Sequence, residues 1–381
     1  MNTNKIMPIA LIHNQFGPYH IARAKVLQKI YPGIVSLIQL ADQELQREWT
    51  VDEEILEIFT VINGALETLS PKIIADKLVK YLAKLKPAVV IIAGYSHLAM
   101  RTATKWAKQN GVKTILLSDS QSLDRPRNFI KESLKGWWIT NNFDAAFVAG
   151  ASAASYLSNL GFRRDRIWRC YDVVDNQYLT TNAVVARDLA EIRQKLNLPE
   201  HFFLYVGRFS AEKNLLRLIK AFHLYQQQNR NNWSLVMVGN GSQHPELKDT
   251  VTRLGIKNVV WTGFKQISEL PAYYGLASAL ILPSISEPWG LVVNEAMACS
   301  LPILISDRCG CLLDLVFPGI NGYVFNPFKI ASIKAGLEYL SSQSQHKLSK
   351  MADASGQIIA NYTPETWATS LVDCIEVLNL N

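Results

Sequence analysis

The chain has 381 residues, of which 49% are hydrophobic and 19% charged, a composition typical of a globular protein. This length exceeds what one hydrophobic core usually organises, so we expect two domains. Apolar runs all fall short of the ~20 residues that a membrane-spanning helix needs, and the N-terminal residues lack the pattern of a signal peptide. Five scattered cysteines indicate buried thiols in a reducing cytoplasm, and Cys309-Gly310-Cys311 is too tightly spaced for an ordinary zinc site.

The net charge of +7 is concentrated in the first half of the chain. Residues 1–180 hold 22 Lys/Arg against 16 Asp/Glu, whereas residues 181–381 hold 17 against 16. A basic first half favours an acidic acceptor or an anionic membrane surface as a partner. Nucleic acid is disfavoured, because the sequence has neither a zinc finger, nor an RNP motif, nor a dense basic run.

One stretch of the first half is the best candidate for membrane contact. It runs from Arg125 and Arg127 through Lys131 and Lys135 to the pair Trp137-Trp138. Cations mixed with tryptophans are typical of interfacial helices. The alternative is a solvated helix face with both tryptophans packed inward. We therefore expect a cytoplasmic protein with peripheral contact at the inner face of the membrane.

Short apolar runs alternate with helical patterns through the first half. Strands are expected at Ile9–His13, Ile34–Leu40, Ile58–Ile62, Ala88–Ala93, Val112–Leu117, Ala145–Ala149 and Ile167–Tyr171. Helices are expected at Ile21–Ile30, Pro71–Leu85, Leu98–Asn110 and Ser152–Leu160. Strands that alternate with helices predict a parallel sheet with right-handed crossovers.

The same alternation restarts in the second half. Strands are expected at Phe202–Val206, Ser234–Val238, Asn258–Trp261, Ala279–Leu282 and Ile303–Ile305, and helices at Leu215–Gln228 and Leu291–Cys299. We therefore predict a first domain over residues 1–176, a linker over 177–199 and a second domain over 200–362. Residues 363–381 form a last helix, with Pro364 at its first position and an apolar face that includes Trp367 and Leu371.

A pair of acidic residues, Glu287 and Glu295, brackets the turn between an expected strand and an expected helix. In open α/β sheets, ligands bind at such turns, at the carboxyl ends of the strands. The N-terminus of the helix from Leu291 offers free backbone N–H groups, which suit a phosphate. If all eight steps were helical, the carboxylates would lie about 12 Å apart along the axis, too far for a shared-proton dyad. The spacing suits two ends of one extended ligand, such as a nucleotide-sugar.

A second candidate motif spans Gly207 to Asn214. Gly207 lets the backbone turn tightly after a strand, and Arg208 and Lys213 follow in the same loop. The planar guanidinium and the mobile ammonium both suit a diphosphate. The alternative is a pair of exposed loop cations without a ligand.

These motifs resemble the signature of the retaining glycosyltransferases of family 4, which have the GT-B fold. The resemblance rests on the Glu-x7-Glu spacing and on the continuation from Glu295 to Ser306, Glu-Ala-Met-Ala-Cys-Ser-Leu-Pro-Ile-Leu-Ile-Ser. It implies an α/β chain with two doubly wound, Rossmann-like domains facing each other across a cleft. The second domain would bind a nucleotide-sugar and the first an acceptor, and the last helix would pack back on the first domain.

The resemblance also implies roles for residues near the donor. Glu295 would accept hydrogen bonds from the ribose, and Glu287 would bind the transferred sugar. Arg208 and Lys213 would neutralise the leaving diphosphate. The remaining donor contacts would come from backbone groups and one side chain: Gly290 and Leu291 at the phosphate or sugar, the glycine loops at Gly207, Gly239 and Gly263, and Phe264 with Lys265 at the base.

In the first half, His97 follows a strong strand and matches a position where the family often has a histidine near the donor sugar. The loop after the first strand departs from the family pattern, because it has the single glycine Gly17 where a Gly-Gly pair is common. His13 and His20 flank that glycine and are candidate acceptor contacts. Asp119, at the end of another strand, is a weaker candidate.

The Asp-x-Asp motif does not occur in the sequence. Glycosyltransferases of the other large fold use that motif to hold a metal. We therefore expect no metal site and no cofactor beyond the nucleotide-sugar. The implied activity is retaining transfer of a hexosyl group, with UDP as the expected carrier, to a glycan, lipid-linked or small-molecule hydroxyl in polysaccharide or glycolipid biosynthesis. A nucleotide-sugar epimerase of the same fold and a non-catalytic partner subunit remain as alternatives.

Overall fold

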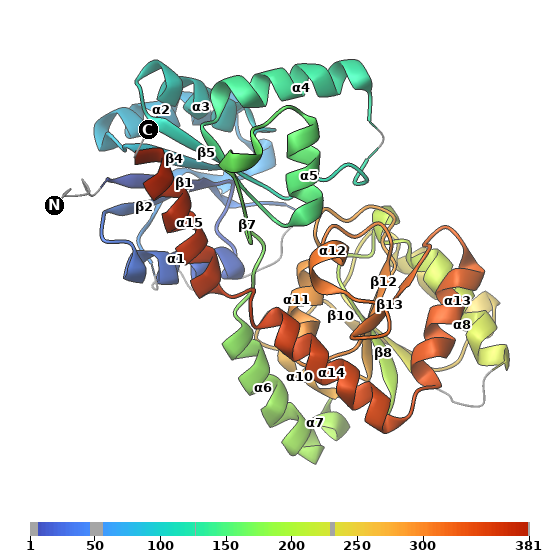
Figure 1. Ribbon diagram of the computed structural model, residues 1–381. Helices are drawn as coiled ribbons and strands as arrows, with labels where there is room; N and C mark the ends of the chain where they lie inside the picture. Colours follow the sequence, from blue (N-terminus) through green and yellow to red (C-terminus); the bar gives the residue numbers. More distant parts are fainter. Residues whose placement is uncertain (1–6, 46–55, 126, 229–232, 380–381) are drawn as a thin grey trace. The chain divides into compact units, whose positions relative to one another are not determined.

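The computed structural model describes residues 7–45, 56–125, 127–228 and 233–379. Their contacts divide the chain into two compact units (Figure 1). The first unit comprises 1–120, 127–173 and 364–381, and the second comprises 121–126 and 174–363. No helix in the described parts of the chain is long and apolar enough to cross a membrane.

The first unit is built on a seven-stranded, wholly parallel sheet in the order β3-β2-β1-β4-β5-β6-β7. Its central strands are fully buried, which explains their unbroken apolar runs. The strands are β1 Ile9–His13, β2 Val35–Gln43, β3 Ile58–Ala65, β4 Val89–Ala93, β5 Lys113–Ser118, β6 Ala145–Val148 and β7 Ile167–Arg169.

Helices that follow these strands complete the first unit. They are α1 Pro18–Ile30, α2 Pro71–Leu85, α3 Leu98–Gln109, α4 Phe129–Asn142, α5 Ala151–Asn159 and α15 Pro364–Asn379. The last of them, α15, contacts α1, β6 and β7. Its side chains Trp367, Leu371, Ile375 and Leu378 are buried, so an apolar stripe at helical spacing fixes this C-terminal segment on the first unit.

The second unit is built on a six-stranded parallel sheet in the order β10-β9-β8-β11-β12-β13. This is the 3-2-1-4-5-6 strand order of dinucleotide-binding Rossmann folds. The strands are β8 Phe202–Val206, β9 Ser234–Val238, β10 Val259–Gly263, β11 Ala279–Leu282, β12 Ile303–Ser306 and β13 Gly322–Phe325. The helices are α6 Asn176–Asp188, α7 Ala190–Lys195, α8 Leu215–Gln228, α9 His244–Arg253, α10 Leu270–Leu276, α11 Leu291–Ala298, α12 Leu312–Leu315, α13 Ile330–Ser341 and α14 Gln345–Ile359.

The predicted fold class, two doubly wound α/β units with parallel sheets, is confirmed. The region predicted as a linker is instead occupied by α6 and α7, which belong to the second unit. Helix α6 buries Leu179 and Ala183 and packs on α10, where a Cβ on Gly275 would lie 2.6 Å from the Ala183 carbonyl oxygen. The outer face of α6 is largely polar and the segment holds no strand pattern, so the sequence resembled a linker. Strand β13 was not predicted from the sequence, because it is short, begins with glycine and is only partly buried.

Candidate active site

The topology of the second sheet brings the two candidate motifs together. Strands β9 and β10 lie on one side of β8, and β12 and β13 lie on the far side of β11. The loops that follow β8 and β11 therefore leave adjacent parallel strands at the point where the winding of the sheet reverses. These are residues 207–214 and 283–290, the loops that carry Arg208, Lys213 and Glu287.

Backbone and side-chain amide hydrogen bonds join these two loops. The Ile285 N–H donates to the Glu212 carbonyl oxygen at 2.9 Å. Asn214, which has a left-handed backbone with φ of 62°, donates from Nδ2 to the carbonyl oxygens of Pro283 at 3.0 Å and Pro327 at 2.9 Å. Asn214 is buried, so its amide supplies hydrogen bonds that these carbonyl groups need away from water.

The side chains of the two motifs form an ion pair. Lys213 Nζ lies 2.5 Å from Glu287 Oε2, and the Ser284 hydroxyl donates to the same oxygen at 2.9 Å. Only 17% of the Lys213 side chain and 11% of the Glu287 side chain are exposed, so each charge depends on the other for compensation. A diphosphate that binds Lys213 would therefore compete with Glu287 for the same ammonium group.

Arg208 is the more exposed of the two candidate cations. Its side chain is 57% exposed and lies 3.7 Å from the Glu212 carboxylate. The buried Tyr205 hydroxyl donates to the Arg208 carbonyl oxygen at 2.8 Å and holds the loop backbone. Burial, followed by the nearby Glu287 and Glu212 carboxylates, raises the pKa of Tyr205 well above its usual value, so this phenol stays a donor.

The loops at the ends of β9 and β10 pack closely, backbone to backbone, beside the loop that follows β8. Gly239 has φ of 136°, and a Cβ at this position would lie 1.9 Å from the Gly207 carbonyl oxygen. The Gly239 N–H in turn donates to the Gly263 carbonyl oxygen at 2.8 Å. Gly207, Gly239 and Gly263 thus line neighbouring loops at one edge of the sheet. Beyond them, Phe264 is half-buried, and the Lys265 ammonium lies 3.1 Å from Glu269.

Helix α11 begins at the end of the Glu287 loop. Gly290 caps it with φ of 108°, a left-handed conformation that favours glycine. In the first turn, the Val293 N–H donates to the Gly290 carbonyl oxygen at 2.9 Å, and the N–H groups of Leu291 and Val292 are those that suit an anion. The buried Trp289 indole donates to Asn294 Oδ1 at 2.9 Å and ties the loop to the helix.

Glu295, the second acid of the pair, is only 3% exposed on α11. The Tyr274 hydroxyl, from α10, donates to Glu295 Oε2. A carboxylate on an apolar helix requires a polar partner, and this phenol supplies one. Nothing in the sequence indicates Tyr274 as that partner.

Sequence reasoning also missed Gln121, whose segment, residues 121–125, belongs to the second unit. Its Nε2 donates to the carbonyl oxygens of Glu287 and Arg308, both at 2.9 Å, and its side chain is buried. The Ser286 hydroxyl donates to the Asp124 carbonyl oxygen nearby. Gln121 thereby fixes the backbone of Glu287 from outside both motifs. A single polar residue in a polar loop carries no sequence signal for this role.

The segment Cys309-Gly310-Cys311 packs against the same loop, residues 283–290. The Gly310 N–H donates to the Glu287 carbonyl oxygen at 3.0 Å, and a Cβ on Gly310 would lie 1.7 Å from the Pro288 carbonyl oxygen. Both cysteines are buried thiols that form no disulfide within the described residues. Burial raises the pKa of the Cys309 thiol well above its usual value, so it stays protonated. This segment is therefore a close-packed support for the Glu287 loop.

The candidate residues of the first half lie in the first unit. His97 caps α3, and its Nδ1 accepts a hydrogen bond from the Ala99 N–H at 3.1 Å. Burial, with the neighbouring Arg101, lowers the pKa of His97, so its imidazole is neutral near pH 7. Gly17 caps α1 with φ of −98°, an extended conformation open to any residue. Backbone conformation therefore does not require glycine at position 17.

The two other histidines of the first unit lie beside Gly17. The Gly17 N–H donates to His20 Nδ1 at 3.0 Å. The rings of His13 and His20 lie 4.2 Å apart, and His13 is buried at 4% exposure. Because His13 is buried, His20 is the more solvent-accessible of the two histidines.

Comparisons with known proteins agree with this site. Residues 188–357, just under half of the chain, match the family model described as glycosyl transferases group 1. This segment covers most of the second unit, including every donor-side residue predicted in that unit.

Several curated glycosyltransferases are similar to part of the chain. The chain is 28% identical to an uncharacterised glycosyltransferase of Methanocaldococcus jannaschii over 47% of its own length and 45% of the relative. It is 28% identical to alpha-D-kanosaminyltransferase of Streptomyces kanamyceticus, over 46% and 45%, and 25% identical to O-antigen chain mannosyltransferase B of Escherichia coli, over 60% and 61%. The chain thus spans about half the length of the first curated relatives it matches.

Solved glycosyltransferase structures match nearly the whole chain. Sucrose-phosphate synthase from Thermosynechococcus elongatus gives a TM-score of 0.76 at 18% identity, over 98% of this chain and 99% of the other. HepE of Anabaena in complex with UDP gives 0.76 at 17% identity, over 97% and 100%. With its two doubly wound parallel sheets, the chain has the GT-B fold.

Gln121→Leu should destabilise the Glu287 loop, because the substitution removes the amide that donates to two carbonyl groups. Loss of such hydrogen bonds costs about 1–3 kcal/mol of the free energy of unfolding. Thermal unfolding and hydrogen exchange of peptides that cover residues 284–290 measure the effect. Leu123→Ala, an exposed neighbour in the same segment, is the matched control. Unchanged exchange in the Gln121 variant would show that this amide does not hold the loop.

Proposed function

We propose that this protein is a retaining glycosyltransferase of family 4 type, which moves a hexosyl group from a nucleotide-sugar to a hydroxyl acceptor in glycan or glycolipid biosynthesis. The Lys213–Glu287 pair at the switch point of a Rossmann sheet carries the proposal. It joins, in one small volume, a cation for the diphosphate and a carboxylate for the sugar. Sugar transfer needs both groups next to each other.

The donor would lie along the carboxyl edge of the second sheet. Arg208, Lys213 and the N-terminus of α11 supply positive charge for the diphosphate. Glu295 would accept from the ribose and Glu287 from the hexose, while the loop at Gly263 and Phe264 would hold the base. UDP is the carrier we favour, because HepE of Anabaena, a structural match, was solved with UDP-glucose.

The chemistry requires charge stabilisation more than a side-chain base. As the bond between the hexose and the diphosphate breaks, negative charge grows on the phosphate oxygens beside Arg208 and Lys213. Preorganised cations at that position stabilise the transition state. The departing phosphate would take the acceptor proton, which gives retention without a dedicated base. His97, as a neutral imidazole of the first unit, would act near the donor sugar, and Gly17 would contact the donor through its backbone.

Turnover assays should show release of nucleoside diphosphate from a nucleotide-sugar, and this release should survive excess chelator. The reason is that Arg208, Lys213 and the α11 N-terminus supply the positive charge that a metal otherwise provides. A loss of turnover that Mg²⁺ or Mn²⁺ restores would contradict metal independence. Conversion of the donor sugar without release of the diphosphate would favour an epimerase, and binding without any turnover would favour a non-catalytic subunit.

Arg208→Ala and Lys213→Ala should each weaken nucleoside diphosphate binding by about 1.5–3 kcal/mol, the range for hydrogen bonds to charged groups. Isothermal titration calorimetry measures the affinities. Arg253→Ala, an exposed cation of α9, is the control for a general loss of positive charge. Thermal unfolding is measured in parallel, because Lys213→Ala also leaves Glu287 buried without its partner. Wild-type affinity in both variants would remove the diphosphate assignment.

Substitution of the two glutamates should affect different steps. Glu295→Gln should weaken binding of both free nucleotide and nucleotide-sugar, because the acid would hold the ribose. Glu287→Gln should not weaken free nucleotide binding, since it only releases Lys213, but it should lower kcat about 100- to 1,000-fold through the lost contact to the reacting sugar. Steady-state kinetics with nucleotide titrations decide the matter. Full turnover in Glu287→Gln would mean that this acid does not act at the donor sugar.

A further inference from the structure

Helix α4 of the first unit presents an unpartnered apolar face. Phe129 is 85% exposed, Ile130 68%, Leu134 64% and Trp137 67%. At 100° per residue these four side chains fall within an arc of about 140° on one side of the helix. The face runs from Phe129 to Trp137, a little over two helical turns, and is here called the α4 ridge.

The opposite side of α4 is locked against the unit, so the ridge cannot turn inward. A Cβ on Gly136 would lie 2.3 Å from the Leu160 carbonyl oxygen, and Ile139 is buried. Trp138 packs inward, with its ring 5.5 Å from Tyr95 and 5.8 Å from Phe143. The two neighbouring tryptophans therefore have opposite surroundings. Of the pair that the sequence singled out, only Trp137 belongs to the exposed surface.

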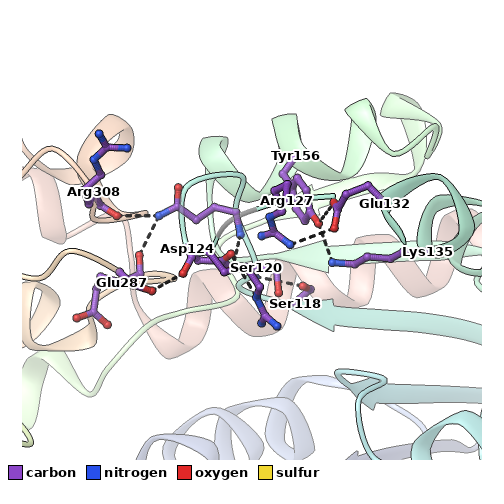
Figure 2. A network of polar contacts seen from close by, with 12 residues as sticks. Ser118, Ser120, Asp124, Arg127, Glu132, Lys135, Tyr156, Glu287 and Arg308 are labelled. Carbon is purple, nitrogen blue, oxygen red and sulfur yellow. Dashed lines mark hydrogen bonds and ion pairs between the residues drawn. The ribbon is translucent and has the colours of Figure 1, made fainter. Parts of the chain in front are cut away.

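Charged groups on α4 are arranged so that the acid is neutralised beneath the helix. Glu132, its single acidic residue, accepts from the Tyr156 hydroxyl and lies 3.4 Å from Arg127 (Figure 2). Lys135 donates to the same Tyr156 hydroxyl at 2.7 Å and is half-buried, so its ammonium group is directed toward Tyr156. Lys131 is exposed beside the ridge, and α3, which contacts α4, adds the exposed Arg101 and Lys105.

We propose that the α4 ridge binds the surface of a lipid bilayer that contains anionic lipids. The ridge is convex, with side chains that project from a single helix. A bilayer accepts such side chains without a matching pocket, whereas a protein partner's strongest contacts are made in packed pockets. The exposed Lys131 flanks the ridge and the contacting helix α3 carries two more exposed cations, and this positive charge complements the negative charge of anionic headgroups. The Thr140 and Asn141 side chains donate to backbone carbonyls of α4 itself, so the polar margin requires no outside partner.

The test uses the full chain and sedimentation with vesicles of phosphatidylcholine alone or with phosphatidylglycerol. The triple variant Phe129→Ser, Leu134→Ser, Trp137→Ser should bind anionic vesicles about 100-fold more weakly than wild type, because each lost apolar side chain lowers the free energy of insertion. Binding of wild type should also fall as salt rises, since exposed charges are screened within about 8 Å at physiological ionic strength. Neutral vesicles should bind wild type more weakly than anionic ones.

The matched control is Leu313→Ser with Ile320→Ser, which removes two similarly exposed apolar side chains from the second unit. This control should bind vesicles as wild type does. Circular dichroism should show that both variants keep the fold. The proposal is overturned if wild type fails to sediment with anionic vesicles at low salt. It is also overturned if light scattering shows a dimer that the triple variant breaks, because a second copy would then cover the ridge.

Discussion

The ion pair between Lys213 and Glu287 is the interaction on which the candidate site depends. It exists because parallel strands β8 and β11 are neighbours although β9 and β10 separate them in sequence. Two mostly buried charges cost several kcal/mol each to desolvate, and mutual compensation offsets that cost only when the geometry is held. A bound diphosphate could replace the carboxylate as the partner of Lys213. Glu287 would then be free to face the sugar, so the ligand-free pairing keeps both groups positioned for a donor.

Backbone contacts, more than side chains, hold this geometry. Gly239 and Gly310 let their loops approach carbonyl groups that any Cβ would strike. Asn214 and Gln121 then fix the same loops with side-chain amides. The pair is thus surrounded by a scaffold of short, directional contacts that leave little room for rearrangement. Such second-layer support is what keeps reactive groups within hydrogen-bond reach of a ligand.

Sequence patterns were sufficient for the fold and for the two signature loops. Long apolar runs and glycines after strands predicted most strands of both sheets and the positions of Arg208, Lys213, Glu287 and Glu295. The patterns failed where a residue's role depends on a distant partner. Tyr274 and Gln121 look ordinary in sequence, because only folding brings them to Glu295 and to the Glu287 backbone. The sequence singled out the stretch from Arg125 to Trp138 but did not separate the exposed Trp137 from Trp138, which packs inward.

Hydrogen exchange with and without UDP, followed by mass spectrometry, tests the donor-site account most directly. We predict protection by UDP in four segments that end strands of the second sheet: residues 207–214, 239–243, 263–266 and 287–295. Glycine-rich loops exchange readily when free, and a bound diphosphate would occupy their N–H groups. Protection confined to other parts of the chain would contradict the account, as would binding that leaves residues 207–214 and 287–295 unchanged.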